Sequence, residues 1–283
     1  MPRLILNADD FGLTPGVNRA IAELRAAGAL TSTTWMANGA ACNDAITIAQ
    51  QQPSMGVGCH IVLVDGIPVS PPSHVASLLG DASRSGDSFH RAPGTFLRDL
   101  YLGRIRPQHI EQEAIAQIRK LQQAGIAVTH VDTHKHLHSF PAVLRPVLRA
   151  AQACGVPAIR NPYEPDWSLR RTNGAGWMRQ LEVRLLRTQR DLFLREVERA
   201  AMKTTDGCIG VLATGSMTEA LLQEMLEAMP AGTWELVTHP GWNDAELQQV
   251  RTRLTASREI ELHAMIKVVP AFTGLHRIHY GDL

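Results

Sequence analysis

A run of nine residues, His130 to His138, carries a side chain that can bind a metal or a proton at every second position. In order, these residues are His130, Asp132, His134, His136 and His138. Alternate residues of an extended strand point to one face, so the spacing predicts that all five share a face. A straight strand of this length spans about 26 Å, which is too far for one metal to reach both ends. We therefore expect two of these groups at the centre of a site and the others in outer positions.

A pair of adjacent aspartates, Asp9 and Asp10, follows the apolar residues 4–6 and precedes an expected helix that starts at Thr14 and Pro15. Thr is a favourable N-cap, and Pro is tolerated in the first helical turn. Acidic residues between a strand and the next helix stand where α/β enzymes place their chemistry. Two structural alternatives stay open: the aspartates are an N-cap or turn pair, and the histidine run is a polar strand face or a surface cluster.

Two further histidines belong to predicted strands: His60 lies within the apolar segment 57–64, and His239 follows the apolar segment 234–237. A single histidine in an apolar strand is more often a hydrogen-bonded core residue than a ligand. If the sheet closes, however, the ends of these strands converge on one face. One aspartate and two histidines are a common ligand set for a catalytic divalent ion. A second carboxylate as general base and a histidine as acid would then give metal-assisted hydrolysis, without naming the bond that is cut.

Strands and helices alternate along the chain, with six or seven apolar strand segments between amphipathic helices. This alternation predicts a mostly parallel sheet, and closure into a barrel is the simplest way to cover it. The 283 residues match the size of an α/β barrel, about 250 residues. We therefore expect one α/β domain over residues 1–283: a TIM-barrel-like (β/α) barrel that is distorted or has fewer than eight strands. Residues 66–95, rich in Pro, Ser and Gly, predict a long loop or lid.

Three later segments carry specific predictions. Residues 157–160 predict a short strand, residues 177–201 one long Arg-rich amphipathic helix, and residues 244–264 a final helix. The Arg-rich helix is typical of a solvated outer helix. A homodimer face and a patch that touches a membrane surface are the alternatives.

The overall composition excludes several classes of protein. A formal net charge of +1 argues against a general nucleic-acid binder, which has a basic excess. The four cysteines are scattered without a paired spacing, as is typical of reduced thiols. The sequence shows neither a secretory signal nor an apolar span that could cross a bilayer. We therefore expect a cytoplasmic protein without a nucleic-acid partner.

Several blocks of the sequence, in order over nearly the whole chain, resemble the YdjC/ChbG carbohydrate deacetylases. The blocks are residues 4–13 (LILNADDFGL), 31–34 (TSTT), 37–39 (ANG), 56–60 (GVGCH), 65–69 (DGIPV), 130–138 (HVDTHKHLH) and 238–241 (THPG). The resemblance implies removal of acetyl groups from N-acetylated amino sugars, on a barrel-like α/β fold with one divalent metal ion. Position by position, it implies Asp9 as the general base and His239 as the acid. The implied metal ligands are Asp10, His60 and His134.

The resemblance also implies three substrate-binding or outer residues that orient the base or a ligand: Arg160, His136 and His138. Two positions depart from the family pattern, because Lys135 stands where some relatives have another His and Trp242 where a Tyr is expected. Neither departure removes an implied ligand. Two His and a carboxylate suit Zn²⁺ by ligand softness, whereas the resemblance points towards Mg²⁺ for some members, so the metal stays open.

Four blocks are similar to one branch of the family, HpnK: residues 63–72, 134–136, 160–165 and 240–247. This similarity implies an N-acetylglucosaminyl hopanoid lipid as the substrate in place of an oligosaccharide, and it would give the Arg-rich helix a membrane-docking role. Two rival functions stay open. One is another metal-dependent hydrolase, such as a phosphoesterase or an amidohydrolase, and the other is a sugar- or metal-binding protein without activity.

Overall fold

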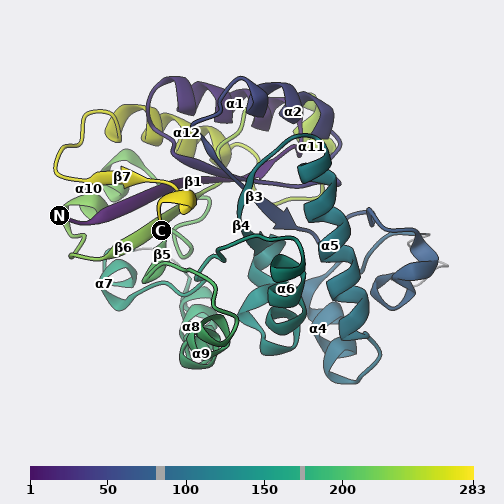
Figure 1. The fold of residues 1–283 in the computed structure, drawn as a ribbon. Coiled ribbons are helices and arrows are strands. Elements are labelled where there is room, and N and C mark those ends of the chain that lie inside the picture. Colours follow the sequence, from purple (N-terminus) through teal and green to yellow (C-terminus); the bar gives the residue numbers. More distant parts are fainter. Residues whose placement is uncertain (81–86, 173–175) are drawn as a thin grey trace.

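Parallel strands form the centre of the molecule, in a computed structural model that describes residues 1–80, 87–172 and 176–283. The strands are β1 (Arg3–Phe11), β2 (Ser32–Trp35), β3 (Gly56–Ile61), β4 (Val128–Thr133), β5 (Gly207–Ile209), β6 (Thr233–Thr238) and β7 (His276–Ile278). Six of them pair in the order β4-β3-β2-β1-β6-β5, and β7 pairs with β1. The sheet curls into half a barrel within a single domain (Figure 1), which confirms the expected distorted barrel with fewer than eight strands.

Residues 157–163 lie between β4 and β5, where the curled sheet is open. Arg160 N donates to Val131 O at 3.0 Å on one side, and Ile159 N donates to Lys203 O at 2.9 Å on the other. The short strand predicted over residues 157–160 is therefore present in part, as isolated parallel bridges of Ala158 and Ile159 and not as a continuous ladder. Pro157 and Pro162 lack the backbone N–H groups that would extend the pairing into a regular strand.

Helices surround the sheet on its outer side (Figure 1). They are α1 (Pro15–Ala26), α2 (Cys42–Gln50), α4 (Pro93–Tyr101), α5 (Pro107–Gln123), α6 (Pro141–Ala153), α7 (Asp166–Leu169), α8 (Trp177–Arg187), α9 (Arg190–Arg199), α10 (Glu219–Glu227), α11 (Ala245–Gln249) and α12 (Ser257–Val268). Short 3₁₀ turns are η1 (Pro72–His74), η2 (Ala76–Leu78), η3 (His134–Ser139) and η4 (Tyr280–Asp282). None of the described helices is both long and apolar enough to cross a membrane.

The first helix begins where the sequence predicts. The Thr14 hydroxyl accepts a hydrogen bond from Val17 N at 3.3 Å, so it caps the helix that starts at Pro15. Gly28 follows the last turn with φ +67°, a conformation that glycine adopts without steric cost. The cap matters for function because it fixes where the chain turns after Asp9 and Asp10.

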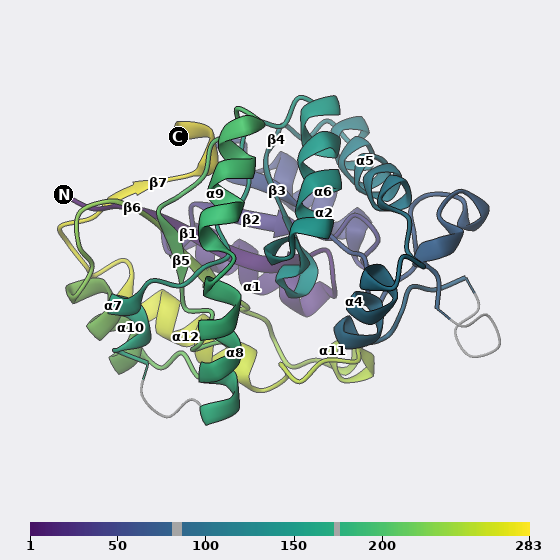
Figure 2. The same cartoon turned by 90° about the horizontal axis from the view of Figure 1, so that it is seen from below.

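Two long predicted helices are each broken into two. Residues 177–201 form α8 and α9, which follow one another along one side of the molecule (Figure 2). The Thr188 hydroxyl donates to Leu185 O at 2.7 Å and so competes for the carbonyl that would continue the helix. Residues 244–264 contain α11 and part of α12, because Val250 is extended (φ −77°, ψ 136°) and ends the first of them.

The predicted loop at 66–95 packs against α5 where it is described; residues 81–86 lie outside the described residues. Val69 N and Ser70 N donate to the carboxylate of Glu113 in α5 at 2.8 and 3.0 Å. Leu78 and Phe89 are fully buried in the core. The segment therefore has its own apolar anchor, and a role as a lid stays a prediction.

The C-terminal residues close the end of the sheet where β1 begins, an element that the sequence analysis missed. β7 pairs with Arg3, Leu4 and Ile5 at the start of β1, and both chain termini lie at this end (Figures 1 and 2). Tyr280, in η4, is buried, and its ring stacks on His130 of β4 with centroids 3.8 Å apart. The barrel interior is therefore filled by side chains below the site.

Candidate metal and catalytic site

The two adjacent aspartates sit at the end of β1, and both reach the same region. Neighbouring residues of a strand normally point to opposite faces. Asp10, however, has φ +67°, a left-handed conformation that breaks the alternation. As a result Asp9 Oδ2 lies 3.7 Å from His239 Nε2, and Asp10 Oδ1 lies 3.6 Å from His60 Nε2.

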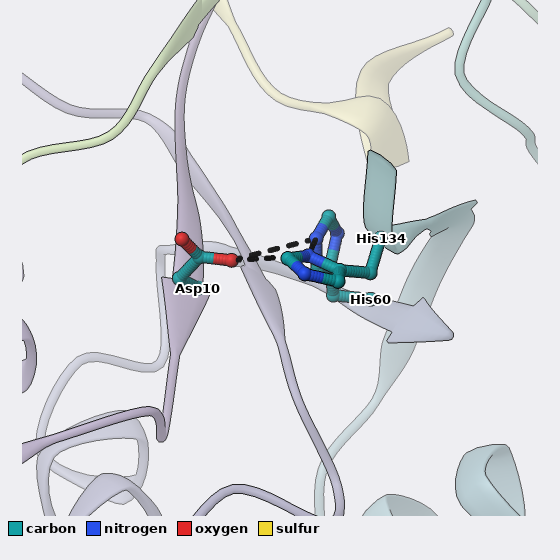
Figure 3. Close-up of side chains that lie close together, drawn as sticks. All are labelled: Asp10, His60 and His134. Atoms are coloured by element: carbon teal, nitrogen blue, oxygen red, sulfur yellow. Dashed lines mark hydrogen bonds and ion pairs between the residues drawn. The ribbon is translucent and has the colours of Figure 1, made fainter. Parts of the chain in front are cut away.

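Three side chains from different strand ends form a compact cluster (Figure 3). Asp10 Oδ1 lies 3.6 Å from both His60 Nε2 and His134 Nδ1, and the two ring nitrogens are 3.3 Å apart. Both imidazole rings face the same carboxylate oxygen. Asp10 and His60 are buried, whereas the His134 side chain is 21% exposed, so the cluster is reached from the side of His134.

The donor set of this cluster fits a divalent cation. Asp10 Oδ1 is buried and accepts no hydrogen bond from any described residue. Burial holds the pKa of His134 below its usual value in spite of Asp10, which favours the neutral ring that metals bind. One carboxylate oxygen and two imidazole nitrogens are a usual three-ligand set of catalytic sites, which leave further positions open for water and substrate.

A second trio lies within ligand distance of one another: Asp9, His60 and Asp132. This trio does not fit a metal as well, because the guanidinium of Arg160 already contacts both of its carboxylates. Arg160 donates to Asp9 Oδ1 at 2.7 Å and to Asp9 Oδ2 at 2.9 Å, and it also donates to Asp132. The Arg160 guanidinium already balances the charge of these two carboxylates and would repel a metal ion. Asp10, His60 and His134 are therefore the better candidate ligands.

His60 is oriented by the neighbouring strand. Asp132 is its register partner across β3 and β4, and the Nδ1 of His60 donates to the two Asp132 oxygens at 2.8 and 2.9 Å. This bond leaves Nε2 directed at Asp10, the usual arrangement of a carboxylate behind a metal-binding His. Burial opposes charge on His60, but Asp132, Asp9 and Asp10 raise its pKa to about 9. The surroundings therefore stabilise positive charge at this point.

Asp9 is held as an ionised carboxylate. Besides Arg160, it accepts hydrogen bonds from Asn7 Nδ2 at 2.9 Å and Thr34 Oγ1 at 2.8 Å. Burial by itself would raise the pKa of Asp9, but the charge and hydrogen bonds of Arg160, with His60 and His239, hold the pKa well below its usual range. The carboxylate is thus charged and aligned throughout the neutral pH range.

Arg160 is in turn held by Glu235 of β6. Its Nε lies 3.0 Å from both Glu235 oxygens, and its Nη2 donates to one of them at 2.7 Å. The Tyr280 hydroxyl donates to the other Glu235 oxygen. Burial raises the pKa of Glu235 although Arg160 and Tyr280 oppose this rise. The Arg160 side chain is fully buried. It can therefore affect the site only by holding Asp9 and Asp132 in position.

The histidine run does not form one strand, so the prediction that five side chains share a face is wrong. β4 ends at Thr133, and Lys135 and His136 have φ values of +58° and +51° within η3. Lys135 donates to Asp65 at 2.8 Å, which ties this turn to the start of the loop after β3. The left-handed residues turn the chain directly after His134, whose Nδ1 lies 3.6 Å from Asp10.

The remaining histidines of the run lie around the cluster at different depths. His130 is fully buried against Tyr280. The His138 Nδ1 lies 2.8 Å from Thr133 Oγ1, and its ring is also fully buried. His136 is half-buried; burial and the charge of Arg160 lower its pKa to about 3, so the ring is neutral.

Three residues at this site were missed by the sequence analysis. Arg258 in α12 donates to Asp10 Oδ2 at 2.6 Å, while Glu235 and Tyr280 hold Arg160. None of the three belongs to a recognisable motif, and each is brought in by the tertiary fold from a distant part of the chain. Asp132 belongs to the histidine run, and its position two residues before His134 is a usable sequence signal for a residue that orients a ligand.

Comparisons with known proteins agree on one family. Residues 3–269 match a family described as "YdjC-like protein". A protein named carbohydrate deacetylase from Thermoanaerobacter pseudethanolicus is 30% identical over 92% of this chain and 89% of its own length. Another protein of that name, from Mus musculus, is 32% identical over 85% of this chain and 78% of its own length. A third, from Brevibacillus brevis, is 39% identical, but the match spans 57% of this chain and 60% of that protein.

Solved structures show the same fold. A putative cellobiose-phosphate cleavage protein from Enterococcus faecalis superposes with a TM-score of 0.80 at 22% identity, over 99% of this chain and 98% of its own. A lactam utilization protein from Thermus thermophilus superposes with a TM-score of 0.52 at 14% identity, over 98% of this chain and 99% of its own. These structures show a shared fold, and the match over residues 3–269, with the relatives at 30% and 32% identity, identifies the chain as a member of the YdjC-like family.

Proposed function

We propose that this chain is a metal-dependent deacetylase, a hydrolase that cleaves the acetamide C–N bond of an N-acetylated amino sugar. The observation that carries the proposal is the meeting of Asp10, His60 and His134 at the end of β1, with Asp9 and His239 beside them. Membership of the YdjC-like family supports it, as do the relatives named carbohydrate deacetylase.

The proposed metal ligands are Asp10, His60 and His134. A divalent ion held there would supply Lewis acidity, which would polarise the acetyl carbonyl and lower the pKa of water. The two imidazole nitrogens favour Zn²⁺, and Mg²⁺ is the alternative.

Asp9 is the proposed general base. It accepts a proton from the water whose oxygen forms a bond to the acetyl carbon. Its contacts with Arg160, Asn7 and Thr34 involve both oxygens and prevent the carboxylate from turning away. Arg160 is therefore a positioning residue for the base, and Glu235 holds it in place.

His239 is the proposed acid. Its backbone N–H donates to Glu261 at 2.6 Å, which fixes the residue at the end of β6. The side chain is 13% exposed and lies beside Asp9. From this position it gives a proton to the amide nitrogen as the C–N bond breaks, and the products are acetate and the free amine. We propose His136 and His138 as residues that line the substrate pocket or orient the residues that do.

The test is a mass-spectrometric screen for a loss of about 42 Da, the acetyl-for-hydrogen difference, across acetylated sugars and glycolipids with and without a chelator. We expect the loss to disappear with the chelator and to return with added metal. Asp9→Asn should lower kcat about 10²- to 10⁴-fold while leaving metal content nearly unchanged. Full activity of this variant would reject Asp9 as the base, and phosphate release from generic esters without acetate release would support the phosphoesterase rival.

As a finer assignment we propose an amphiphilic glycolipid substrate of the hopanoid-linked type, reached from the cytoplasmic side of a membrane. An apolar hollow of about 450 Å³ between α4, α6 and α8 supports this assignment; it is lined by Tyr101, Phe140, Leu185 and Leu186, with Arg145 at its edge. Tyr101 and Leu185 are 63% and 60% exposed. Brisk deacetylation of chitobiose with no activity on an N-acetylglucosaminyl lipid would remove this assignment. If this face forms a homodimer contact instead, the molar mass measured in solution would be that of two chains.

A further inference from the structure

Arg258, near the start of α12, contacts the proposed ligand Asp10 across 248 positions of sequence. Its Nη2 donates a hydrogen bond of 2.6 Å to Asp10 Oδ2. The side chains of Arg258 and Asp10 are 1% and 3% exposed, so water screens the ion pair weakly. Arg258 Nε donates to Leu254 O at 3.0 Å, which fixes the guanidinium from its other side.

The two oxygens of Asp10 consequently have different surroundings. Oδ2 is held by Arg258, whereas Oδ1 faces His60 and His134 and accepts no hydrogen bond within the part of the chain that the structure describes. A carboxylate can bind a cation through one oxygen or through both. Because the guanidinium occupies Oδ2 and repels other cations there, only Oδ1 is free to bind one.

The glycine after the His239-Pro240 pair makes room for this arrangement. A Cβ at Gly241 would lie 2.9 Å from Arg258 Cδ and 3.0 Å from Val17 Cγ2. A side chain at this position would press on the aliphatic part of Arg258. The stretch after β6 therefore supplies His239 and also leaves space for the residue that holds Asp10.

We propose that Arg258 is a positioning residue that restricts Asp10 to binding the metal ion through Oδ1 alone. This inference rests on the metal-dependent function proposed above. Binding through one oxygen leaves more positions for water and the acetyl oxygen than binding through two. The guanidinium charge also opposes the charge of the ion, so Arg258 weakens cation binding while it keeps the site open.

The test uses Co²⁺ as the probe, added to metal-free wild-type protein and to Arg258→Met. Methionine removes the charge and fills the space of the aliphatic part of Arg258. We expect Arg258→Met to bind Co²⁺ at least about tenfold more tightly, whereas kcat at saturating metal should fall about 10- to 100-fold. Its visible Co²⁺ bands should weaken, as they do at higher coordination number, because Oδ2 then joins Oδ1.

Two further variants separate positioning from a general structural effect. Arg258→Lys keeps the charge and a donor, and it should restore the wild-type Kd and spectrum together with most of kcat. Arg277→Met is the matched control, because Arg277 also donates to main-chain carbonyls, those of Val269 and Phe272, but away from the site. It should leave the Kd for Co²⁺ and the spectrum unchanged, whatever its stability.

An unchanged Kd and spectrum in folded Arg258→Met would overturn the proposal, and so would weaker binding with normal kcat at saturating metal. If Arg258→Met does not fold, Gly241→Ala decides, because it displaces the aliphatic part of Arg258 and should show the same tighter but slower behaviour; a wild-type profile would overturn the proposal. A wild type that binds no Co²⁺ and releases no acetate overturns the proposed function and this inference together. If the wild type binds Co²⁺ and releases acetate, and the variants behave identically to it, this inference alone is overturned.

Discussion

Two clusters of charged and imidazole side chains meet at the end of β1, and they differ in how many polar atoms are already paired. The Arg160 cluster is closed, because one guanidinium contacts Asp9, Asp132 and Glu235 and is fully buried. The Asp10 cluster is open: two imidazole nitrogens face a carboxylate oxygen that has no hydrogen bond from any described residue.

The difference shows that residue type alone does not locate a metal site. Both clusters contain carboxylates, and His60 belongs to both trios that lie within ligand distance. In the closed cluster Arg160 already supplies the positive charge, and the groups it holds are fixed in direction. In the open cluster Arg258 pairs with Asp10 only through Oδ2, so Oδ1 keeps no hydrogen-bond partner among the described residues. The closed cluster thus acts as the support of the open one, through Asp132 behind His60 and through the orientation of Asp9.

The largest expected effect comes from breaking the closed cluster. Arg160→Met leaves three buried carboxylates without their cation, so we expect the free energy of unfolding to fall by about 3–5 kcal/mol or more. Denaturant unfolding measures this loss. Arg160→Lys keeps the charge but not the planar fork, and it should recover part of the stability and little of the activity. A stability loss below about 1 kcal/mol for Arg160→Met, the range of an exposed pair, would mean that the cluster is not the closed support described here.

The open cluster should show the opposite pattern, with weak effects on folding and strong effects on metal. His134 is partly exposed, so His134→Gln should change stability little but weaken cation binding at least about 100-fold, which is about 2.7 kcal/mol. Calorimetric titration of the metal-free protein with Zn²⁺ measures this affinity. His276→Gln, a change of an exposed His on β7, is the control. Equal affinities in the two variants would remove His134 from the ligand set.

A smaller effect should follow from the outermost contact of the closed cluster. Tyr280→Phe removes the hydroxyl that donates to Glu235, so we expect a loss of about 1–3 kcal/mol in stability and a fall in kcat of less than about tenfold, or 1.4 kcal/mol. Tyr163→Phe is a matched control, because its hydroxyl donates to the main-chain oxygen of Ser139 at 2.9 Å and has no link to Arg160. If both variants lower kcat equally, Tyr280 has no special connection to the base.

The smallest expected effect is a pH dependence of stability from His130. Burial and the charge of Arg160 hold the pKa of His130 well below its usual value, so the folded protein keeps it neutral. Below about pH 6.5 the unfolded chain binds a proton that the folded chain does not, so stability falls as pH falls, by at most about 1.4 kcal/mol per pH unit for this group.

His130→Gln cannot titrate, so its stability should fall less steeply between about pH 6.5 and 5 than that of the wild type. Urea unfolding at several pH values gives the two slopes. Parallel slopes would show that His130 is not kept neutral in the folded protein.

Much of the fold follows from periodicity and capping signals. The first helix begins at Pro15 behind the Thr14 cap, as the sequence predicts. Predictions failed where local and tertiary preferences compete: the histidine run reads as a strand by alternation, but its chain turns at Lys135 and Asp65 holds the turn. The short strand β7 has too few residues to carry a pattern of its own, and its pairing with β1 defines it.

The sequence by itself determined which residue types could do chemistry and that they stand at the ends of separate strands, because apolar periodicity and turn residues are local properties of a chain. Only the tertiary structure decided which of these groups have unpaired atoms. Asp10 and Asp9 are adjacent and chemically identical, yet one is held by Arg258 through a single oxygen and the other by Arg160 through both. Those partners come from 248 and 151 positions away, and no local pattern encodes a contact at that separation.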